Sequence, residues 1–248
     1  MRNVLRAVQL LFRQFPFLAA LRMLIAEAAR KVFDPYGVLS YGQTGEDCII
    51  AALLGTRSAG FYVDVGCHHP YRLSNTLRLY KHGWTGLVID GNPQAIQLFR
   101  KFRPRDTGVC AVVSDHRAKV TFSVDLDEPA ISTIASEPPM KDGPNFGASA
   151  IRDVQVQTVT LEELFVQYCV PAQFDLLSID VETHNLEALR SFDLSSFRPR
   201  LIVVETDADV DSRINGAVQG YLGQRGYRRV AYALRNAYFV RDQDSREN

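Results

Sequence analysis

Short apolar runs rich in β-branched residues recur along this chain, and segments with helical character follow most of them. Five such runs occupy residues 60–66, 84–93, 107–115, 174–182 and 198–207. Buried strands of four to six apolar residues that alternate with helices are typical of a parallel sheet covered by helices on both faces. The alternation therefore predicts an α/β fold.

The segments between these runs predict the helices and their ends. Asn92 and Pro93 are a typical helix cap and first residue, and Thr158 or Thr160 can cap a helix that runs to residue 168. Further helices are expected within residues 40–55, 74–83 and 185–192, a further short strand at 119–125, and a terminal hairpin at 227–242 with its turn near Arg235 and Asn236.

Acidic residues stand at the ends of nearly all the predicted strands. The set comprises Asp64, Asp90, Asp115, Asp180 with Glu182, and Glu205. Ligands of open α/β sheets bind outside the carboxyl ends of the strands, where the strand order reverses. One acidic strand end can be a helix cap, but several together indicate a binding or catalytic site.

The first three strand ends favour an adenosine-type ligand. Gly66 lets the backbone turn and a ligand approach, but Cys-His-His-Pro follows it, so the G-x-G-x-x-G fingerprint of NAD-binding proteins is absent. Asp90, about two dozen residues later, is placed to accept hydrogen bonds from a ribose, since Asn92 is the better helix cap. Ser114 and Asp115 stand where an adenine amino group would lie, or they form a plain turn.

Four segments together resemble the FkbM family of S-adenosylmethionine-dependent methyltransferases. They read SYGQTGED, GFYVDVGCHHPYRLSNTLRLYKHGWTGLVIDGNP, FDLLSIDVE and RPRLIVVE. The resemblance implies a Rossmann-like class I methyltransferase fold with a seven-stranded, mostly parallel sheet whose last strand is antiparallel. It also implies S-adenosylmethionine as the cofactor and O-methylation of a hydroxyl, often on a sugar of a glycolipid, oligosaccharide or polysaccharide, or on a secondary metabolite.

The resemblance also assigns roles to residues around the first strand. Asp64 and Gly66 would shape the turn under the methionine half of the cofactor, and His68 and His69 would form its lip. Residues expected around these are Gln43, Glu46 and Asp47 over the amino-carboxylate end of the cofactor, Pro70 in the lip, Asn75 from the next helix, and Asp180 as an orienting group.

The chain departs from the family pattern at two places. Thr183 replaces the glycine of the usual Asp-Val-Glu-Gly, and Asp90-Gly91 replaces the usual Glu-Pro after the second strand. An aspartate at position 90 keeps the ribose acceptor on a shorter side chain. The departure at Thr183 affects the acceptor side of the expected site more than the cofactor side.

The expected reaction needs a base to accept a proton from the acceptor hydroxyl. Glu182, just beyond the fourth strand of the predicted order, is the first candidate, and His69 and His184 follow. His184 has the side chain whose ordinary pKa best suits neutral pH. Alternatively, Glu182 does no more than cap the following helix.

Other functions fit the sequence less well. His68, His69, Asp180, Glu182 and His184 could ligate a metal, but adjacent histidines point apart and no H-x-x-x-H pair is present, so no metal is expected beyond a weakly held Mg²⁺ on carboxylates. No G-x-S-x-G elbow of a serine hydrolase occurs. A Rossmann-like nucleotide-binding protein without methyltransferase activity and a non-enzymatic membrane-docking protein remain as alternatives.

The N-terminus carries a different kind of signal. Residues 1–36 hold six Arg or Lys against two acidic residues, in a chain whose formal net charge is +0. We expect a basic helical arm (1–36) and a methyltransferase body (37–248). We predict that residues 2–15 form an amphipathic helix. This helix would rest on an anionic membrane, on a partner chain or on the body itself. Pro16 should end or kink that helix.

Partners and location follow from these features. The balanced charge of the whole chain gives no reason to expect nucleic acid as a partner. Four scattered cysteines and no visible secretory signal predict a cytoplasmic protein, peripheral at the inner membrane face if the arm binds lipid.

The long segment 127–149, rich in Pro and Gly, is expected to be an acceptor loop or disordered. The oligomeric state stays open, a homodimer included.

Overall fold

The structure is a computed structural model that describes residues 12, 17–33, 37–55, 57–125, 133–134, 151–206 and 213–242. Most of the predicted arm helix at residues 2–15 and most of the loop at 127–149 therefore lie outside the described residues.

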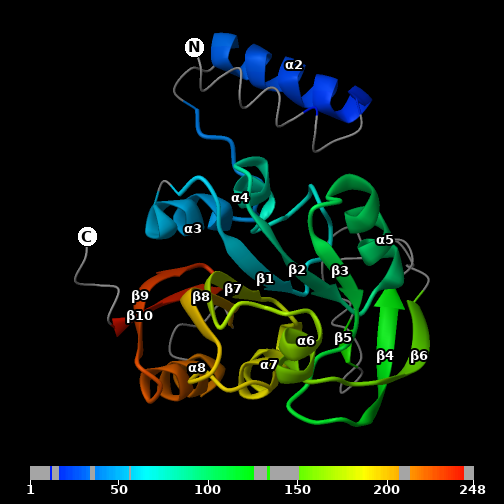
Figure 1. Ribbon diagram of the computed structural model, residues 1–248, viewed down its shortest axis with the longest axis vertical. Coiled ribbons are helices and arrows are strands. Elements are labelled where there is room, and N and C mark those ends of the chain that lie inside the picture. Colours follow the sequence, from blue (N-terminus) through cyan, green and yellow to red (C-terminus); the bar gives the residue numbers. More distant parts are fainter. Residues whose placement is uncertain are drawn as a thin grey trace.

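A seven-stranded sheet forms the centre of the body (Figure 1). Its strands, in spatial order, are β3 (Thr107–Cys110), β2 (Thr85–Asp90), β1 (Phe61–Val65), β7 (Gln173–Ile179), β8 (Arg198–Glu205), β10 (Asn236–Arg241) and β9 (Tyr227–Ala233). All neighbours pair in parallel except β10, which is antiparallel to both β8 and β9. The predicted mostly parallel sheet with an antiparallel last strand is confirmed, and so is the terminal hairpin.

Helices cover both faces of this sheet because its strands bury both sides. The face that includes Tyr62 and Val88 packs against α3 (Glu46–Leu54), α4 (Leu77–Lys81) and α5 (Pro93–Phe102). The alternate residues, such as Val63 and Leu87, pack against α6 (Leu161–Gln167), α7 (Asn185–Arg190) and α8 (Arg213–Gly223). Such side-to-side alternation is the two-residue period of a strand.

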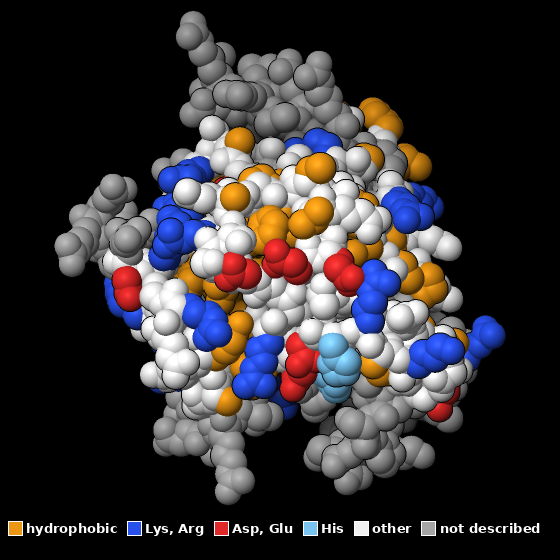
Figure 2. All heavy atoms as spheres, turned by 60° about the horizontal axis from the view of Figure 1, so that its bottom comes forward, with side chains coloured by type: hydrophobic (Ala, Val, Ile, Leu, Met, Phe, Trp, Pro, Cys, Tyr) orange, Lys and Arg blue, Asp and Glu red, His pale blue; other side chains and the backbone are white. Residues whose placement is uncertain are grey.

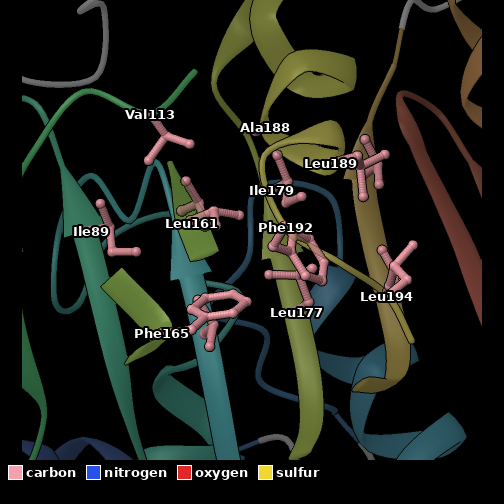
Figure 3. Packing of buried hydrophobic residues seen from close by; sticks show 14 of the residues in the cluster. Ile89, Val113, Leu161, Phe165, Leu177, Ile179, Ala188, Leu189, Phe192 and Leu194 are labelled. Carbon is pink, nitrogen blue, oxygen red and sulfur yellow. The ribbon is translucent and has the colours of Figure 1, made fainter. Parts of the chain in front are cut away.

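Aromatic rings fill the second of these two layers (Figure 3). The ring of Phe165 on α6 meets those of Phe192 and Phe197 edge to face, with centroids 5.1 and 5.0 Å apart. Leu177 and Ile179 of β7 lie beside them in the same cluster. This packing fixes the position of the carboxyl end of β7.

Two predicted helix starts are confirmed by their hydrogen bonds. The side chain of Asn92 accepts a bond of 2.9 Å from the backbone N–H of Gln94, with Pro93 as the first residue of α5. Thr160 and Glu163 form a reciprocal capping box at the start of α6. Thr158, the alternative cap, instead bonds to the backbone of residues 116 and 118.

Two strand predictions need correction. Residues 119–125 do form a strand, β4 (Lys119–Asp125), but it belongs to a separate antiparallel sheet with β5 (Thr133–Ile134) and β6 (Ile151–Gln157). Strand β3 ends at Cys110, four residues before Ser114, because its pairing with β2 stops there. The chain then continues to a single β-bridge between Val113 and Val159. The second sheet packs Phe122 and its neighbours against Val112 at the edge of the body.

A separate helix, α2 (Phe17–Phe33), lies beyond the body at the N-terminal end (Figure 1). Ala20, fully buried, packs with Leu77 and Tyr80 of α4. The described part of the predicted arm is therefore helical. Among the described residues, no helix is both long and apolar enough to cross a bilayer. All four cysteines are free thiols, as their scattered positions predict.

The turn after β1 depends on Gly66. Its φ of +78° is in the left-handed region, and a Cβ at this position would lie 1.7 Å from the backbone oxygen of Asp180. The backbones that leave β1 and β7 therefore touch at this point, and no side chain fits between them. The sequence predicted that Gly66 would let a ligand approach the backbone. In the structure, the glycine is needed because the backbone of Asp180, just after the neighbouring strand β7, approaches it.

We expect Gly66→Ala to destabilise the protein by about 3 kcal/mol or more, because left-handed strain of about 1–2 kcal/mol adds to the collision with Asp180. Gly226 provides the matched control: its φ is +77°, but a Cβ there would meet nothing within 4 Å. Gly226→Ala should therefore cost about 1–2 kcal/mol. Urea denaturation of both variants measures the difference, and equal losses would show that the contact between the two strand ends is not tight.

Candidate active site at the carboxyl edge of the sheet

The strand order reverses between β1 and β7, so the crevice for a ligand is expected at their carboxyl ends. On the β1 side, the chain turns at Gly66 and passes through residues 67–76 to α4. On the β7 side, it enters the short 3₁₀ helix η1 (Glu182–His184) and then α7. The two halves of the site are therefore the ends of β1 and β2 on one side and the ends of β7 and β8 on the other.

Asp90 joins the first two strand ends. Its carboxylate accepts a bond of 2.8 Å from the backbone N–H of His68 and one of 2.7 Å from that of Asn92. Burial raises the pKa of Asp90 to about 6, against the lowering effect of these two bonds. Each oxygen retains a second lone pair, so the side chain can still accept bonds from a ribose. The Nδ2 of the buried Asn92 has no partner among the described residues.

Asp64 lies deeper, within β1, in a polar network. Thr76 donates a bond of 2.7 Å to Asp64, and Arg103 donates one of 3.0 Å to Thr76. The guanidinium of Arg103 is fully buried, pairs with Asp106 at 2.7 Å and also bonds the hydroxyl of Tyr62. Burial raises the pKa of Asp64 to about 6, against the opposing effects of Thr76 and Arg103. This network fixes the floor of the site and was not predicted.

His69 is the predicted base that the structure supports least. Its Nδ1 accepts bonds of 3.0 Å from the backbone N–H groups of Tyr71 and Arg72, so the proton of the neutral ring is on Nε2. Burial and the neighbours His68 and Arg72 lower its pKa to about 4. These bonds hold the loop of residues 67–76, the lip loop, in shape. They leave no free nitrogen lone pair on His69 to accept a proton.

Three carboxylates converge on the other half of the site. Oxygens of Asp180, Glu182 and Glu205 all lie within 4.8 Å of one another, the first two after β7 and the third at the end of β8. Burial and a hydrogen bond with Glu205 raise the pKa of Asp180 well above its usual range. Partial burial and the charge of Glu205 also raise the pKa of Glu182, while Arg235 opposes them. Such a cluster can share protons, accept several hydroxyl bonds, or hold a hard cation.

Asn185 holds this cluster together, and sequence reasoning missed it. Its amide oxygen accepts a bond of 2.8 Å from the backbone N–H of Val181, and its Nδ2 donates to the carbonyls of Glu182 and Glu205 at 2.7 and 2.8 Å. The side chain is almost fully buried and connects the ends of β7 and β8. In the sequence, an asparagine at the start of a helix looks like an ordinary helix cap. The connection that Asn185 makes between β7 and β8 was therefore not predicted.

The remaining predicted residues lie around the same edge. Asn75 donates a bond of 3.1 Å to Ser178 of β7, so it crosses from the lip loop to the neighbouring strand. His184 ends η1 beside Glu182, and its backbone N–H bonds to Val181. The structure therefore brings Asn75, Glu182 and His184 to the expected edge.

The upstream loop places its two carboxylates in bonds within the protein. Glu46 is buried and accepts bonds from Thr44 and, at 3.1 Å, from Asn236, while Asp47 pairs with Arg78 and bonds Ser40. Both carboxylates therefore join this loop to other elements, Glu46 to β10 and Asp47 to α4, and Gln43 is the exposed residue of the three. Their predicted contact with the cofactor stays a prediction.

Ser114 and Asp115 lie beyond the end of β3, in the connection to the second sheet. Ser114 is buried and its backbone N–H bonds to Val159, whereas Asp115 is exposed and pairs with His116 at 2.6 Å. The bond from His116 is the main reason that the pKa of Asp115 is lowered. The predicted contact of this pair with adenine also stays a prediction.

The strand order and the antiparallel last strand define a Rossmann-like α/β fold of the class I methyltransferase type. The model of the methyltransferase FkbM domain matches residues 64–229, about two thirds of the chain. The chain belongs to the FkbM methyltransferase family. This match spans both halves of the site, from Asp64 to Glu205.

Among solved structures, the chain is similar to a TehB-like SAM-dependent methyltransferase from Corynebacterium glutamicum ATCC 13032 Kitasato. The two are 13% identical, with a TM-score of 0.38, and the likeness covers 90% of this chain and 99% of the other. No curated protein matches the chain.

We predict that Asp90→Asn weakens S-adenosylhomocysteine binding about tenfold or more, because a carboxylate bond to the ribose is worth about 1.5–3 kcal/mol. The ionised carboxylate is the better acceptor, so affinity of the parent protein should rise as pH increases through about 6, the pKa of Asp90. This rise should shrink in the variant. Titration calorimetry across this pH range measures both effects.

The same titration on Asp193→Asn is the control, because Asp193 precedes β8 at the opposite edge of the sheet and its carboxylate bonds Ser195 and Ser196. Thermal denaturation of each variant checks that the fold is kept. Unchanged affinity in folded Asp90→Asn would remove Asp90 from the ribose site.

Proposed function

We propose that this enzyme methylates a hydroxyl oxygen, on a sugar of a glycolipid, oligosaccharide or polysaccharide. The observation that carries the proposal is the convergence of Asp180, Glu182 and Glu205 at the ends of β7 and β8, across the switch point from Asp90. The cofactor supplies the electrophilic methyl group when bound. The protein must then bind the acceptor oxygen, orient it and accept its proton.

The proton acceptor in this proposal is Glu182. A sugar hydroxyl is a very weak acid, and a positioned base contributes about 10²–10⁴ in rate when its pKa is near the working pH. The pKa of Glu182 is raised toward that range, and its side chain reaches solvent, so an acceptor can contact it. Asp180 is more buried and bonded to Glu205, which suits it to orientation.

Several features favour a polyhydroxylated acceptor. Clustered carboxylate oxygens accept bonds from neighbouring hydroxyls of one sugar ring, and three carboxylates lie together here. Strand β5, from the segment predicted to be an acceptor loop, lies beside η1 and so beside Glu182. A hydroxylated secondary metabolite would use the same base, and a panel of acceptors separates the two classes.

Glu182→Gln should lower turnover at least about a hundredfold, since the amide cannot accept the proton. Its affinity for S-adenosylhomocysteine should stay close to that of the parent, because the substitution leaves Asp64 and Asp90 in place. Turnover is measured as S-adenosylhomocysteine release with sugar nucleotides, glycolipids, oligosaccharides and hydroxylated metabolites as acceptors.

Glu187→Gln, the same substitution in the following helix α7, is the matched control and should retain turnover. Parallel assays with EDTA and with added Mg²⁺ test whether the three carboxylates act through a cation. Turnover of Glu182→Gln within a few-fold of the parent would rule out Glu182 as the base and leave His184 to be tested. Cofactor binding without transfer to any acceptor would favour a binding protein without methyltransferase activity.

A further inference from the structure

The outward side of α2 carries large apolar side chains beside the exposed Arg22. Phe17, Leu18, Ile25 and Val32 are 67%, 72%, 60% and 75% exposed. Leu18, Ile25 and Val32 follow one another at intervals of seven residues, which is close to two helical turns, so they form a stripe along one side. Ala29 and Ala28 are exposed on the same side. Large exposed apolar side chains gathered in this way mark an interaction surface.

The opposite side of α2 is attached to the body near the active site. Ala20 is buried against Leu77 and Tyr80 of α4, and Met23 packs in the same cluster with Tyr41 and Tyr71. Tyr71 belongs to the lip loop that His69 holds, and the carbonyl of Tyr41 accepts a bond of 2.8 Å from Ser74 of that loop. The body-facing side of α2 therefore contacts the loop that leads to the rim of the expected cofactor site, and the stripe lies on the other side of the same helix.

The charge of the arm selects the kind of partner. Residues 1–36 carry a net charge of +4, and residues 37–248 carry −4. A second copy that paired through α2 would bring one basic arm against another, which is unfavourable. An anionic lipid surface instead attracts the arm. The face turned forward in Figure 2 carries acidic side chains in its middle and Lys and Arg side chains around them, so its charge is mixed.

We propose that α2 binds the surface of an anionic bilayer, with Leu18, Ile25 and Val32 in the acyl boundary, and that the net positive charge of the arm attracts the anionic headgroups. The cofactor site would then lie close to the membrane. Combined with the proposed function, on which this last step depends, the geometry selects a lipid-linked sugar as the acceptor. The membrane contact itself does not depend on the reaction.

Sedimentation of the full chain with vesicles tests the contact without any acceptor. The parent protein should bind phosphatidylcholine vesicles that contain phosphatidylglycerol, and bind vesicles of phosphatidylcholine alone much more weakly. Added salt should weaken the binding, because it screens the arm from the headgroups. The double variant Leu18→Asp with Ile25→Asp should bind at least about tenfold more weakly, since two buried apolar contacts are lost.

Val166→Asp is the matched control, because Val166 on α6 is also 67% exposed but lies on the body. It should bind vesicles like the parent. S-adenosylhomocysteine calorimetry on the same samples shows that the body of each variant is folded, and Leu18→Ser with Ile25→Ser replaces the double variant if that one does not fold. Failure of methyl transfer with retained vesicle binding would overturn the proposed function but not the membrane contact.

Two results would overturn the membrane proposal. One is a parent protein that ignores anionic vesicles, or that binds them equally at all salt concentrations. The other is a dimer, measured by light scattering, that Leu18→Asp with Ile25→Asp converts to a monomer, since the stripe would then be covered by a second copy.

Discussion

The close contact between Gly66 and the carbonyl oxygen of Asp180 determines where everything else in the site can lie. Because no Cβ fits between the two backbones, the ends of β1 and β7 meet and then separate. The chain after Gly66 turns toward β2, where Asp90 holds it through His68. The chain after Asp180 turns toward β8, where Asn185 holds it. The crevice between these two diverging segments is therefore a consequence of one contact, with each wall fixed by one buried polar side chain.

Carboxyl groups dominate the electrostatics of this crevice. Asp64 and Asp90 have pKa values raised to about 6, and those of Asp180 and Glu182 are also raised. For Asp64 and Asp90 the folded protein binds more protons than the unfolded chain between about pH 4 and 6, so their ionisation costs stability as pH rises through that window. The sulfonium and amino groups of S-adenosylmethionine are cationic. Binding of this cationic group near the carboxylates would lower the electrostatic cost of their ionisation, which is a physical reason for an acidic edge in a methyltransferase.

The repeated strand and helix patterns predicted most of the fold, because burial on both faces leaves a signal in each segment separately. They did not predict the second sheet, although residues 154 and 156 of β6 show the apolar and polar alternation of a strand. The contacts within the site were harder to predict from the sequence than the fold. Asp47 and Glu46 look like ligands in the sequence, but Asp47 pairs with Arg78 and Glu46 bonds Asn236, besides bonds within their own loop. Arg103 and Asn185 look like ordinary helix residues, and their roles depend on partners 27 and 20 residues away.

The replacement of the family's usual glycine by Thr183 is explained by the backbone around it. A glycine after Asp-Val-Glu would allow a left-handed residue in the tight entry to η1, but here the left-handed residue is Glu182 itself, with a φ of 55°. A side chain in this region costs about 1–2 kcal/mol. Strain of this kind persists where surrounding bonds impose it, and Asn185 bonds the backbone on both sides of the residue, at Val181 N–H and at the Glu182 carbonyl. The strained residue is thus the one whose carboxylate lies within 4.8 Å of oxygens of Asp180 and Glu205, and in the proposed function this carboxylate is the base.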